Sequence, residues 1–487
     1  MGIITKQSIY NVISIGFAFI IGAVNMLFLY PSFPGKEFQG LIIALLANSN
    51  IIQPFISFGV QHTLIKFFSD ASSKDQQDRL LWFSLFIPLL VLVLLTPFYI
   101  YFNKEILNFL SNENILVSKF PFLIILISIS TAYFEIFFSW LRIQLKSVFG
   151  NFLKEVYPRL LTFFLLILYA FKFIDLDTFI IYLICGYYLR LIIIMIYSFS
   201  IYLPGFKGFI PSSWRNMLRY SSLIFLSGAA ASFILDIDKS MIFSLTSDAN
   251  VAYYAVAIYV AAIIEAPGRA MFQITSPLVA KALNKNDKTS LENLLKKSSL
   301  NLLIVSGFVF LVINLNLTDF YQIINQEGYA SAIGVVIIVS LGKLFSMSMG
   351  CLNNIIINST KYHYVFWFSI TSAILAVILN YFMIKNFGIT GAALATLVVI
   401  FLINVCKIVL VHILFKIHPY STKTINIIIN LLLIYFLVYF IPSLLNPWLS
   451  IFLRCLLISG LFTIPLIIFK WSNEIWSLIK GIQKKLY

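Results

Sequence analysis

The sequence contains little charge: only 11% of its 487 residues are Asp, Glu, Lys or Arg, whereas 60% are hydrophobic. Soluble domains carry roughly 25% charged residues because their surfaces face water. So few charged residues cannot cover the surfaces of the two or three domains that a soluble chain of this length would form. The high hydrophobicity equally excludes a disordered chain. The composition therefore predicts a protein whose main solvent is lipid.

Cysteine and processing signals are also scarce. The four cysteines lie in apolar runs without the spacing of metal ligands, which argues against a disulfide framework and a metal site. The first apolar run, residues 10–29, has no small-residue cleavage site. Lys6 stands where a myristoylation motif needs Ser or Thr. We therefore expect the first run to be a retained membrane span.

Long apolar runs are what the sequence does contain. A helix needs about 20 apolar residues to cross a bilayer with its backbone hydrogen-bonded internally. The shortest candidate is the fifth, which opens after Pro158. The sequence predicts an all-α integral membrane protein with fourteen spans, at residues 10–29, 41–67, 81–102, 120–141, 160–173, 179–202, 220–243, 251–278, 300–317, 330–352, 365–384, 389–415, 425–441 and 449–469.

The basic residues are distributed unevenly between the two sides of these spans. The termini and the loops after even-numbered spans hold 22 of the 34 Lys and Arg, and the loops after odd-numbered spans hold six. Cytoplasmic loops are rich in Lys and Arg, so both termini are predicted to be cytoplasmic. The net charge of +15 then faces anionic lipid rather than nucleic acid. Residues 471–487 place Ile and Trp at helical spacing among lysines, which predicts an interfacial amphipathic tail.

An internal repeat appears when the chain is shifted by about 213 residues. Pro54 then aligns with Pro267, and Tyr10 meets Tyr220 within three positions. This predicts an N-lobe at 1–210 and a C-lobe at 211–418, each with six spans and related by a pseudo-twofold along the membrane normal, followed by two further spans at 419–470. Transporters interrupt helices at matching positions near the substrate path. Pro54 and Pro267 are predicted to bend their helices, unless two prolines coincide by chance.

Six basic residues lie inside the predicted spans, including four of the eight arginines but only two of the 26 lysines. They are Arg142, Arg190, Arg269, Lys343, Lys407 and Arg454. A cation in the bilayer costs at least about 2.5–3.5 kcal/mol and normally faces a wet cavity or a partner. Arginine offers a rigid fork that matches phosphate oxygens. The excess of arginine therefore predicts a cavity for a phosphate-bearing substrate.

The depth of these residues separates their expected roles. Arg190 and Arg269 lie deepest and Lys343 near mid-span, so we expect these three to bind the substrate. Arg142 and Lys407 lie nearer the cytoplasmic ends, where they either contribute to the same site or extend to lipid headgroups. Arg454, near the outer end, is expected to extend to the headgroups.

Two acids, Glu135 and Glu265, also lie inside spans. Glu265 precedes Arg269 by one turn, so the two share a helix face. The pair is either structural or carries a coupling proton or Na⁺, because a buried carboxylate has a raised affinity for protons. Glu135 and Arg142 share a face of span four and allow the same two interpretations. No other cofactor is expected.

An acid pair, Asp236 and Asp238, closes span seven beside Lys239. Some membrane glycosyltransferases hold a metal and a sugar phosphate with such a pair, but they also have a sizeable external domain. The outer loops of this chain run to about 20 residues at most. A polar cluster at the helix end is therefore the favoured interpretation.

Several short motifs resemble a known family, the oligosaccharide flippases (Wzx type) of the polysaccharide transporter family in the multidrug/oligosaccharidyl-lipid/polysaccharide (MOP) exporter superfamily. The resemblance covers about residues 1–470. The motifs are Asp238-Lys239, Ala252-Tyr253-Tyr254-Ala255-Val256-Ala257, Ser276-Pro277-Leu278 and Gly388-Ile389-Thr390-Gly391-Ala392-Ala393-Leu394-Ala395-Thr396. The family more usually has Asp-Arg where this chain has Asp238-Lys239.

The resemblance implies a bacterial inner-membrane transporter and not an enzyme. It would move an undecaprenyl-diphosphate-linked oligosaccharide, such as an O-antigen unit of lipopolysaccharide, from the cytoplasmic to the periplasmic leaflet. Its two lobes would rock around a cationic cavity. The expected partners are the lipid-linked substrate, anionic lipids and other polysaccharide-assembly proteins, with the protein itself a monomer.

Two alternatives remain at this point. A drug or metabolite antiporter of the same fold would be expected to use acidic cavity residues for cationic substrates, and the balance of six basic to two acidic residues disfavours it. A membrane polymerase or glycosyltransferase is disfavoured by the short outer loops.

Overall fold

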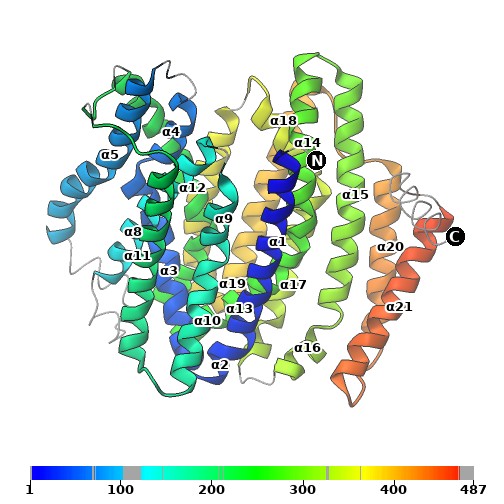
Figure 1. Ribbon diagram of the computed structural model, residues 1–487. Coiled ribbons are helices and arrows are strands. Elements are labelled where there is room, and N and C mark those ends of the chain that lie inside the picture. Colours follow the sequence, from blue (N-terminus) through cyan, green and yellow to red (C-terminus); the bar gives the residue numbers. More distant parts are fainter. Residues whose placement is uncertain are drawn as a thin grey trace. The chain divides into compact units, whose positions relative to one another are not determined.

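The computed structural model describes residues 3–68, 71, 73–101, 122–144, 146–206, 208–211, 213–324, 328–361, 363–469 and 471. In these residues all regular secondary structure is helical (Figure 1). Eleven helices of the described chain are long and apolar enough to cross a membrane, or twelve if a pair bent by 42° counts as one span. The predicted all-α membrane class is confirmed. The predicted amphipathic tail beyond residue 471 lies outside the described residues.

The chain forms two compact units, Met1–Ala252 and Tyr253–Tyr487. The helices of the first unit are α1 (Ile3–Val24), α2 (Tyr30–Ser32), α3 (Lys36–Ser57), α4 (Val60–Phe68), α5 (Lys74–Tyr101), α8 (Leu123–Ile143), α9 (Ser147–Glu155), α10 (Tyr157–Ala170), α11 (Leu176–Ile201) and α12 (Trp214–Leu245). Helix α12 thus belongs to the first unit by its contacts. The lobe boundary predicted at residue 210 was drawn from the sequence repeat, not from contacts between helices, and it remains a prediction.

Helix α8 is the centre of the first unit. It packs against α3, α4 and α11 (Figure 1). Its aromatic residues Phe134, Phe137 and Trp140 are buried and form a hydrophobic core with Ile194 of α11. Each fully buried aromatic or aliphatic side chain of this kind contributes about 1.5–3 kcal/mol relative to exposure in water. This packing gives α8 and α11 a fixed register, which matters for the polar residues that they carry.

A short helix lies at the fifth predicted span, and it is not among the eleven that are long enough to cross a membrane. This helix, α10, has a proline in its first turn, Pro158, where the missing N–H has no helical partner to lose. The amphipathic helix α9 directly precedes it. The apolar run is short because α10 begins only at Tyr157. The segment before it, which the sequence suggested was a loop, forms the separate helix α9.

The second predicted span, 41–67, is divided into α3 and α4. Phe58 and Gly59 have φ angles of 48° and 70°, and the N–H of Phe58 donates to the carbonyl of Pro54 at 2.9 Å. A Cβ on Gly59 would lie 2.8 Å from the carbonyl oxygen of Ser221 on α12. Glycine therefore permits both the left-handed backbone and the close approach of α12. Pro54 lies one turn before this break.

The second unit holds the remaining helices. They are the end of α13 (Asp248–Ala261), a 3₁₀ turn (Ala262–Glu265), α14 (Ala266–Asn284), α15 (Lys288–Asn314), α16 (Leu317–Ile324), a 3₁₀ turn (Tyr329–Ala332), α17 (Ile333–Ser348), α18 (Leu352–Asn358), α19 (His363–Phe415), α20 (Thr422–Tyr439) and α21 (Pro447–Ile468). Pro267 lies in the first turn of α14, directly after the first 3₁₀ turn. Both repeat prolines thus adjoin an interruption of their spans.

Helix α19 comprises two helices that meet at Gly388, where φ is 56° and ψ is −137°. A Cβ on Gly391 would lie only 1.9 Å from the carbonyl oxygen of Met383. Eight residues of straight helix would separate these positions by about 12 Å, so the chain reverses at Gly388. The two halves are the predicted eleventh and twelfth spans.

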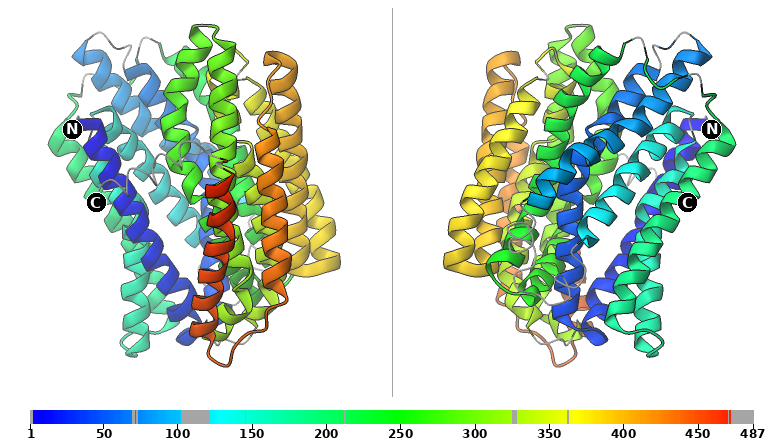
Figure 2. Two further views of the ribbon diagram at one scale, coloured as in Figure 1. Left: turned by 90° about the vertical axis from the view of Figure 1, so that its right-hand side faces the viewer. Right: turned by 90° about the vertical axis from the view of Figure 1, so that its left-hand side faces the viewer.

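The last two helices, α20 and α21, lie side by side against α15 (Figures 1 and 2). Ile427 and Leu431 of α20 share a core with Phe310 of α15 and Phe462 of α21. Each of the fourteen predicted spans therefore overlaps a helix of the structure. Sequence hydropathy located the helices, but not the division of the second span into α3 and α4 or the separate helix α9.

Candidate functional site

Arg190 is a buried cation on α11, with a relative exposure of 4%. Its Nη2 donates a long hydrogen bond of 3.4 Å to Oγ1 of Thr131 on α8. The centre of its guanidinium lies 4.3 Å from the ring centroid of Phe134 and 4.6 Å from that of Tyr187. Its Nε has no hydrogen-bond partner. Within the described chain no carboxylate pairs with Arg190.

The surroundings of Arg190 compensate its charge only in part. Thr131 and Phe134 are three residues apart on α8 and therefore face α11 together. A desolvated cation–π contact contributes about 2 kcal/mol, whereas removing an ion from water costs several kcal/mol even after relaxation. An anion that reaches the guanidinium would neutralise the charge that these contacts leave uncompensated. The aromatic rings and Thr131 thus fix the position of a guanidinium whose charge no described carboxylate neutralises.

Glu135, one turn after Thr131 on α8, does not contact Arg142 as the sequence suggested. It pairs with Lys154 of α9 at 2.7 Å, and the two side chains are 20% and 39% exposed. The sequence analysis placed Lys154 in a cytoplasmic loop. The apolar spacing of Val148, Phe149 and Phe152 in that segment was the available signal for a helix there.

Arg142, at the end of α8, is exposed. It lies 5.9 Å from the ring centroid of Phe138 and lines a cavity of about 460 Å³ together with Phe68 and Gln77. Within the residues that the structure describes it has no carboxylate partner. Arg142 and Arg190, the two arginines that the sequence places inside spans of the first unit, are thus both without an acid partner among the described residues.

In the second unit Glu265 pairs with Lys343, not with Arg269 as expected. Nζ of Lys343 lies 2.8 Å from Oε2 of Glu265, and the side chains are 15% and 33% exposed. The partner comes from α17, which packs against the 3₁₀ turn that ends at Glu265. A contact between helices therefore takes precedence over the neighbour on the same helix.

Arg269 lies exposed on α14, and no carboxylate of the described chain pairs with it. At about 100° per residue, Ser276 shares its helix face, whereas Ile274 and Leu278 lie on the opposite side. Ile274 and Leu278 are also exposed, by 64% and 45%. Helix α14 therefore has an apolar exposed face suited to lipid and a polar exposed face. A cation in a membrane protein normally faces water or a polar partner, so we expect the Arg269 face to be in contact with water.

Lys407 of α19 is half-buried. Its ammonium lies 5.9 Å from the ring centroid of Phe368, and it too lacks a carboxylate partner among the described residues. Of the six basic residues predicted inside the spans, only Lys343 and Arg454 are paired with acids in the described chain. Arg190 is the buried member of the remaining four.

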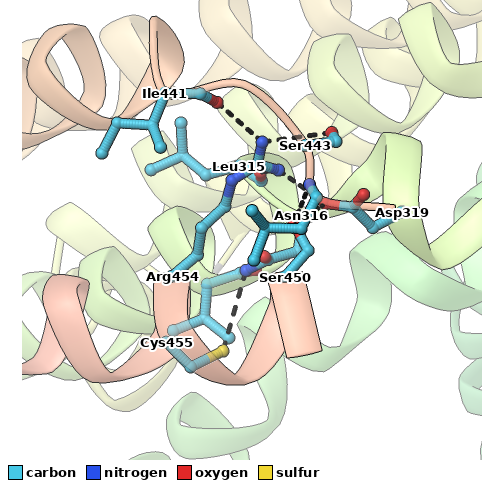
Figure 3. Close-up of polar contacts among 10 residues, drawn as sticks. Leu315, Asn316, Asp319, Ile441, Ser443, Ser450, Arg454 and Cys455 are labelled. Atoms are coloured by element: carbon cyan, nitrogen blue, oxygen red, sulfur yellow. Dashed lines mark hydrogen bonds and ion pairs between the residues drawn. The ribbon is translucent and has the colours of Figure 1, made fainter. Parts of the chain in front are cut away.

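The prediction that Arg454 extends to the headgroups is wrong. Arg454 is 9% exposed and pairs with the fully buried Asp319 of α16 at 2.6 Å (Figure 3). It also donates to the carbonyl oxygens of Leu315 and Ile441, at 3.2 and 2.7 Å. Ser450 donates to the same carboxylate oxygen at 2.9 Å. Asp319 stabilises the cation inside the unit, so Arg454 has a structural partner.

In the acid pair near the C-terminal end of α12, Asp236 makes a contact with a neighbouring helix. Asp236 pairs with Lys239 and accepts a hydrogen bond from Asn50 of α3 at 3.2 Å. Ser240 donates to Asn48 of α3 at 2.6 Å. Among the described residues there is no group of three His, Cys, Asp or Glu side chains that could hold a metal ion. These polar contacts fix α12 against α3.

Solved structures share the fold of this chain. The structure "Lipid II flippase MurJ, inward closed conformation" matches with a TM-score of 0.72 and 16% identity, covering 94% of this chain and 100% of that one. An inward-facing multidrug resistance MATE family transporter of the MOP superfamily matches with a TM-score of 0.61 and 10% identity, covering 84% and 94%. A MOP superfamily transporter from Pyrococcus furiosus, described as having a binding pocket of reverse polarity, matches with a TM-score of 0.57 and 12% identity, covering 85% and 95%.

Sequence comparisons identify the family. A search of curated protein sequences found no match. The family model described as "Polysaccharide biosynthesis protein" matches residues 4–266, more than half of the chain. Together with the shared fold, this match confirms the resemblance to polysaccharide exporters of the MOP superfamily. The chain belongs to the polysaccharide biosynthesis protein family.

Proposed function

We propose that the protein is a flippase that moves a lipid-diphosphate-linked oligosaccharide from the cytoplasmic to the periplasmic leaflet of a bacterial inner membrane. Its family is one of polysaccharide biosynthesis, and its fold is that of a protein described as a lipid II flippase. A substrate of this kind has three parts: an apolar tail, a diphosphate and a polar glycan. The proposal requires a matching surface for each part.

The observation that carries the proposal is the buried, unpaired guanidinium of Arg190. A diphosphate offers oxygens at the spacing of the guanidinium fork and enough charge to offset the burial of the cation. In the second unit, taken by itself, Arg269 of α14 is likewise proposed to bind phosphate oxygens. Arg142 and Lys407, both without acid partners in the described chain, are proposed to attract the substrate from the cytoplasmic side.

An apolar groove in the second unit suits the lipid tail. It has a volume of about 420 Å³ and lies among α15, α17 and α20, with Phe310, Leu344 and Tyr435 among its lining residues. Burying an alkyl chain contributes about 0.8 kcal/mol per methylene group. Leu341 and Phe345 of α17 also line the groove, so Lys343, two residues from each, projects from the other side of that helix. The groove is therefore proposed for the lipid tail alone.

The two acids offer a route for ion coupling. While Glu265 is ionised it holds the ammonium of Lys343 at 2.8 Å. Protonation or Na⁺ binding at Glu265 would free that ammonium for the diphosphate, which links ion and substrate through one pair. Glu135 and Lys154 repeat this arrangement in the first unit. Each carboxylate is thus proposed to exchange a lysine partner for a proton or Na⁺ during transport.

The same pairs disfavour a drug antiporter of this fold. A transporter for cationic drugs needs a carboxylate free to meet the substrate's charge. Glu135 and Glu265, the two acids that the sequence places inside spans, are each neutralised by a lysine. We propose a non-enzymatic, monomeric protein that works among anionic lipids and together with other polysaccharide-assembly proteins.

The test is glycan export by cells in which variants replace the wild-type protein. We expect Arg190→Gln to abolish export and Arg190→Lys to restore part of it, since lysine keeps the charge but not the fork. Arg215→Gln, on an exposed turn of α12, is the matched control and should export normally. Protein level in the membrane is measured for each. Full export by the double variant Arg190→Gln, Arg269→Gln at normal protein level would remove diphosphate binding from the proposal.

A further inference from the structure

Helices α14 and α18 of the second unit hold two asparagine side chains in fixed orientations. Nδ2 of Asn354 donates to the carbonyl oxygen of Phe272 at 2.9 Å and to Oγ1 of Thr275 at 3.0 Å. Nδ2 of Asn358, one turn later, donates to Oγ of Ser276 at 3.3 Å and to the carbonyl oxygen of Asn354 at 2.8 Å. Main-chain carbonyls can only accept, so these contacts fix which end of each amide is nitrogen.

Both N–H protons of each amide therefore donate within the protein, and each Oδ1 remains able to accept a hydrogen bond from a ligand. Neither Oδ1 has a hydrogen-bond partner in the described chain, and neither is buried. The hydroxyl of Ser276 accepts from Asn358 and donates to no described group. The surface thus presents two immobilised acceptors and one free donor. A ligand that satisfies it must bring its own donors.

This surface lies on the side of α14 that we expect to face water. Ser276 follows Arg269 by seven residues, about 10 Å along the same helix face. Asn358 contacts Ser276, and Asn354 lies one turn before Asn358 on α18. The chain after α18 leads to Lys361, in a loop predicted to be cytoplasmic. The amide oxygens therefore lie on the cytoplasmic side of Arg269, at a distance comparable to the length of a diphosphate plus a sugar.

We propose that Asn354, Asn358 and Ser276 recognise the first sugars of the lipid-linked glycan. The two amide oxygens would accept hydrogen bonds from hydroxyl or acetamido N–H groups, and the hydroxyl of Ser276 would donate to a sugar oxygen. This inference rests on the proposed function and names the sugar as the part of the substrate that these residues recognise. An ionised diphosphate has no proton to donate and is repelled by amide oxygens, so it binds at Arg269 while the sugar binds beside it. Sites built to hydrogen-bond a substrate discriminate strongly against analogues that lack the matching group.

The experiment measures binding of two probes to the purified full-length protein in detergent. One probe is bare undecaprenyl diphosphate, and the other is the same lipid diphosphate carrying one N-acetylhexosamine. We expect the wild type to prefer the glycosylated probe. The double variant Asn354→Leu, Asn358→Leu should lose about tenfold in affinity for that probe, the effect of two neutral hydrogen bonds, and keep its affinity for the bare lipid. Arg269→Gln should weaken both probes equally.

Matched controls separate recognition from damage to the fold. Asn386→Leu removes an amide that likewise donates to the carbonyl four residues earlier, on α19 at 2.9 Å, and should leave both affinities unchanged. Ser276→Ala removes one small hydroxyl and should lower the preference for the glycosylated probe by about threefold, even if the double variant fails to fold. An unchanged preference in Ser276→Ala, or in a folded double variant, would overturn the inference. Failure of the wild type to bind either probe would instead overturn the proposed function.

Discussion

The guanidinium of Arg454 lies 2.6 Å from the carboxylate of Asp319, and the carboxylate is fully buried. The pair joins α21 to α16, and the further bond from Arg454 to the carbonyl of Ile441 secures the chain between α20 and α21. Because α20 forms one wall of the apolar groove, this ion pair positions the surface proposed for the lipid tail. It is a structural role for an intramembrane charge.

Breaking this pair should destabilise the second unit severely. Asp319→Ala leaves Arg454 buried without its counter-charge. This should lower the free energy of unfolding by about 3–5 kcal/mol. Replacing both partners, as in Asp319→Leu with Arg454→Met, should recover most of the loss because no charge remains buried. Thermal unfolding of the purified variants in detergent measures both effects. A single variant as stable as the wild type would show that the pair contributes little.

The hairpin in α19 depends on the backbone of Gly388. With φ at 56° and ψ at −137°, an alanine there would be strained by about 1–3 kcal/mol. Gly388→Ala should therefore lower the unfolding temperature. Gly460→Ala is the control, because it lies within α21 with no atom within 4 Å of the added Cβ, and alanine favours a helix by about 1 kcal/mol over glycine. Equal effects of the two changes would contradict the assignment of the reversal to Gly388.

The positions of the spans could be predicted from the sequence because the thickness of the bilayer sets the length of an apolar helix. The break at Phe58 and Gly59 could not, since it lies within an unbroken apolar run and is stabilised by α12, more than 150 residues later in the chain. The separation of the eleventh and twelfth spans was visible because Lys385, Asn386 and Gly388 interrupt the run.

The charged residues of the candidate site could be predicted, but not their partners. Arg190 and Arg269 were identified because few charges enter the spans at all. The partner of Glu265 is 78 residues away, and Asp319 lies in a segment that the sequence analysis placed between spans. Spacing along one helix predicts only neighbours on that helix, whereas packing between helices determined each pair. Lys154 was missed for the same reason.

The orientation of the protein in the membrane follows from its loop charges and can be tested by cysteine labelling. Lys285 follows α14 and Phe173 lies between α10 and α11; both are exposed. A membrane-impermeant thiol reagent applied to intact cells should label Phe173→Cys and should not label Lys285→Cys. Reaction of Lys285→Cys from outside would reverse the predicted topology.

Ion coupling at Glu265 predicts a specific loss. In proteoliposomes with an imposed pH or Na⁺ gradient, we expect transport of the lipid-linked glycan to be stimulated in the wild type. Glu265→Gln should abolish the stimulation but retain basal transport, because Lys343 stays free of its carboxylate whatever the gradient. Stimulation that persists in the variant would exclude Glu265 as the coupling residue. A wild type that ignores both gradients would exclude ion coupling.

The central claim is that Arg190 binds the diphosphate of a lipid-linked glycan during its translocation. The most direct measurement is the rate at which reconstituted protein exposes such a glycan lipid on the opposite leaflet of a proteoliposome. The account predicts clear transport by the wild type and by Arg215→Gln. Arg190→Gln should be slower by about 10- to 100-fold, the effect of losing a charge-assisted hydrogen bond of about 1.5–3 kcal/mol. Equal rates for Arg190→Gln and the wild type, at equal amounts of folded protein, would contradict the account.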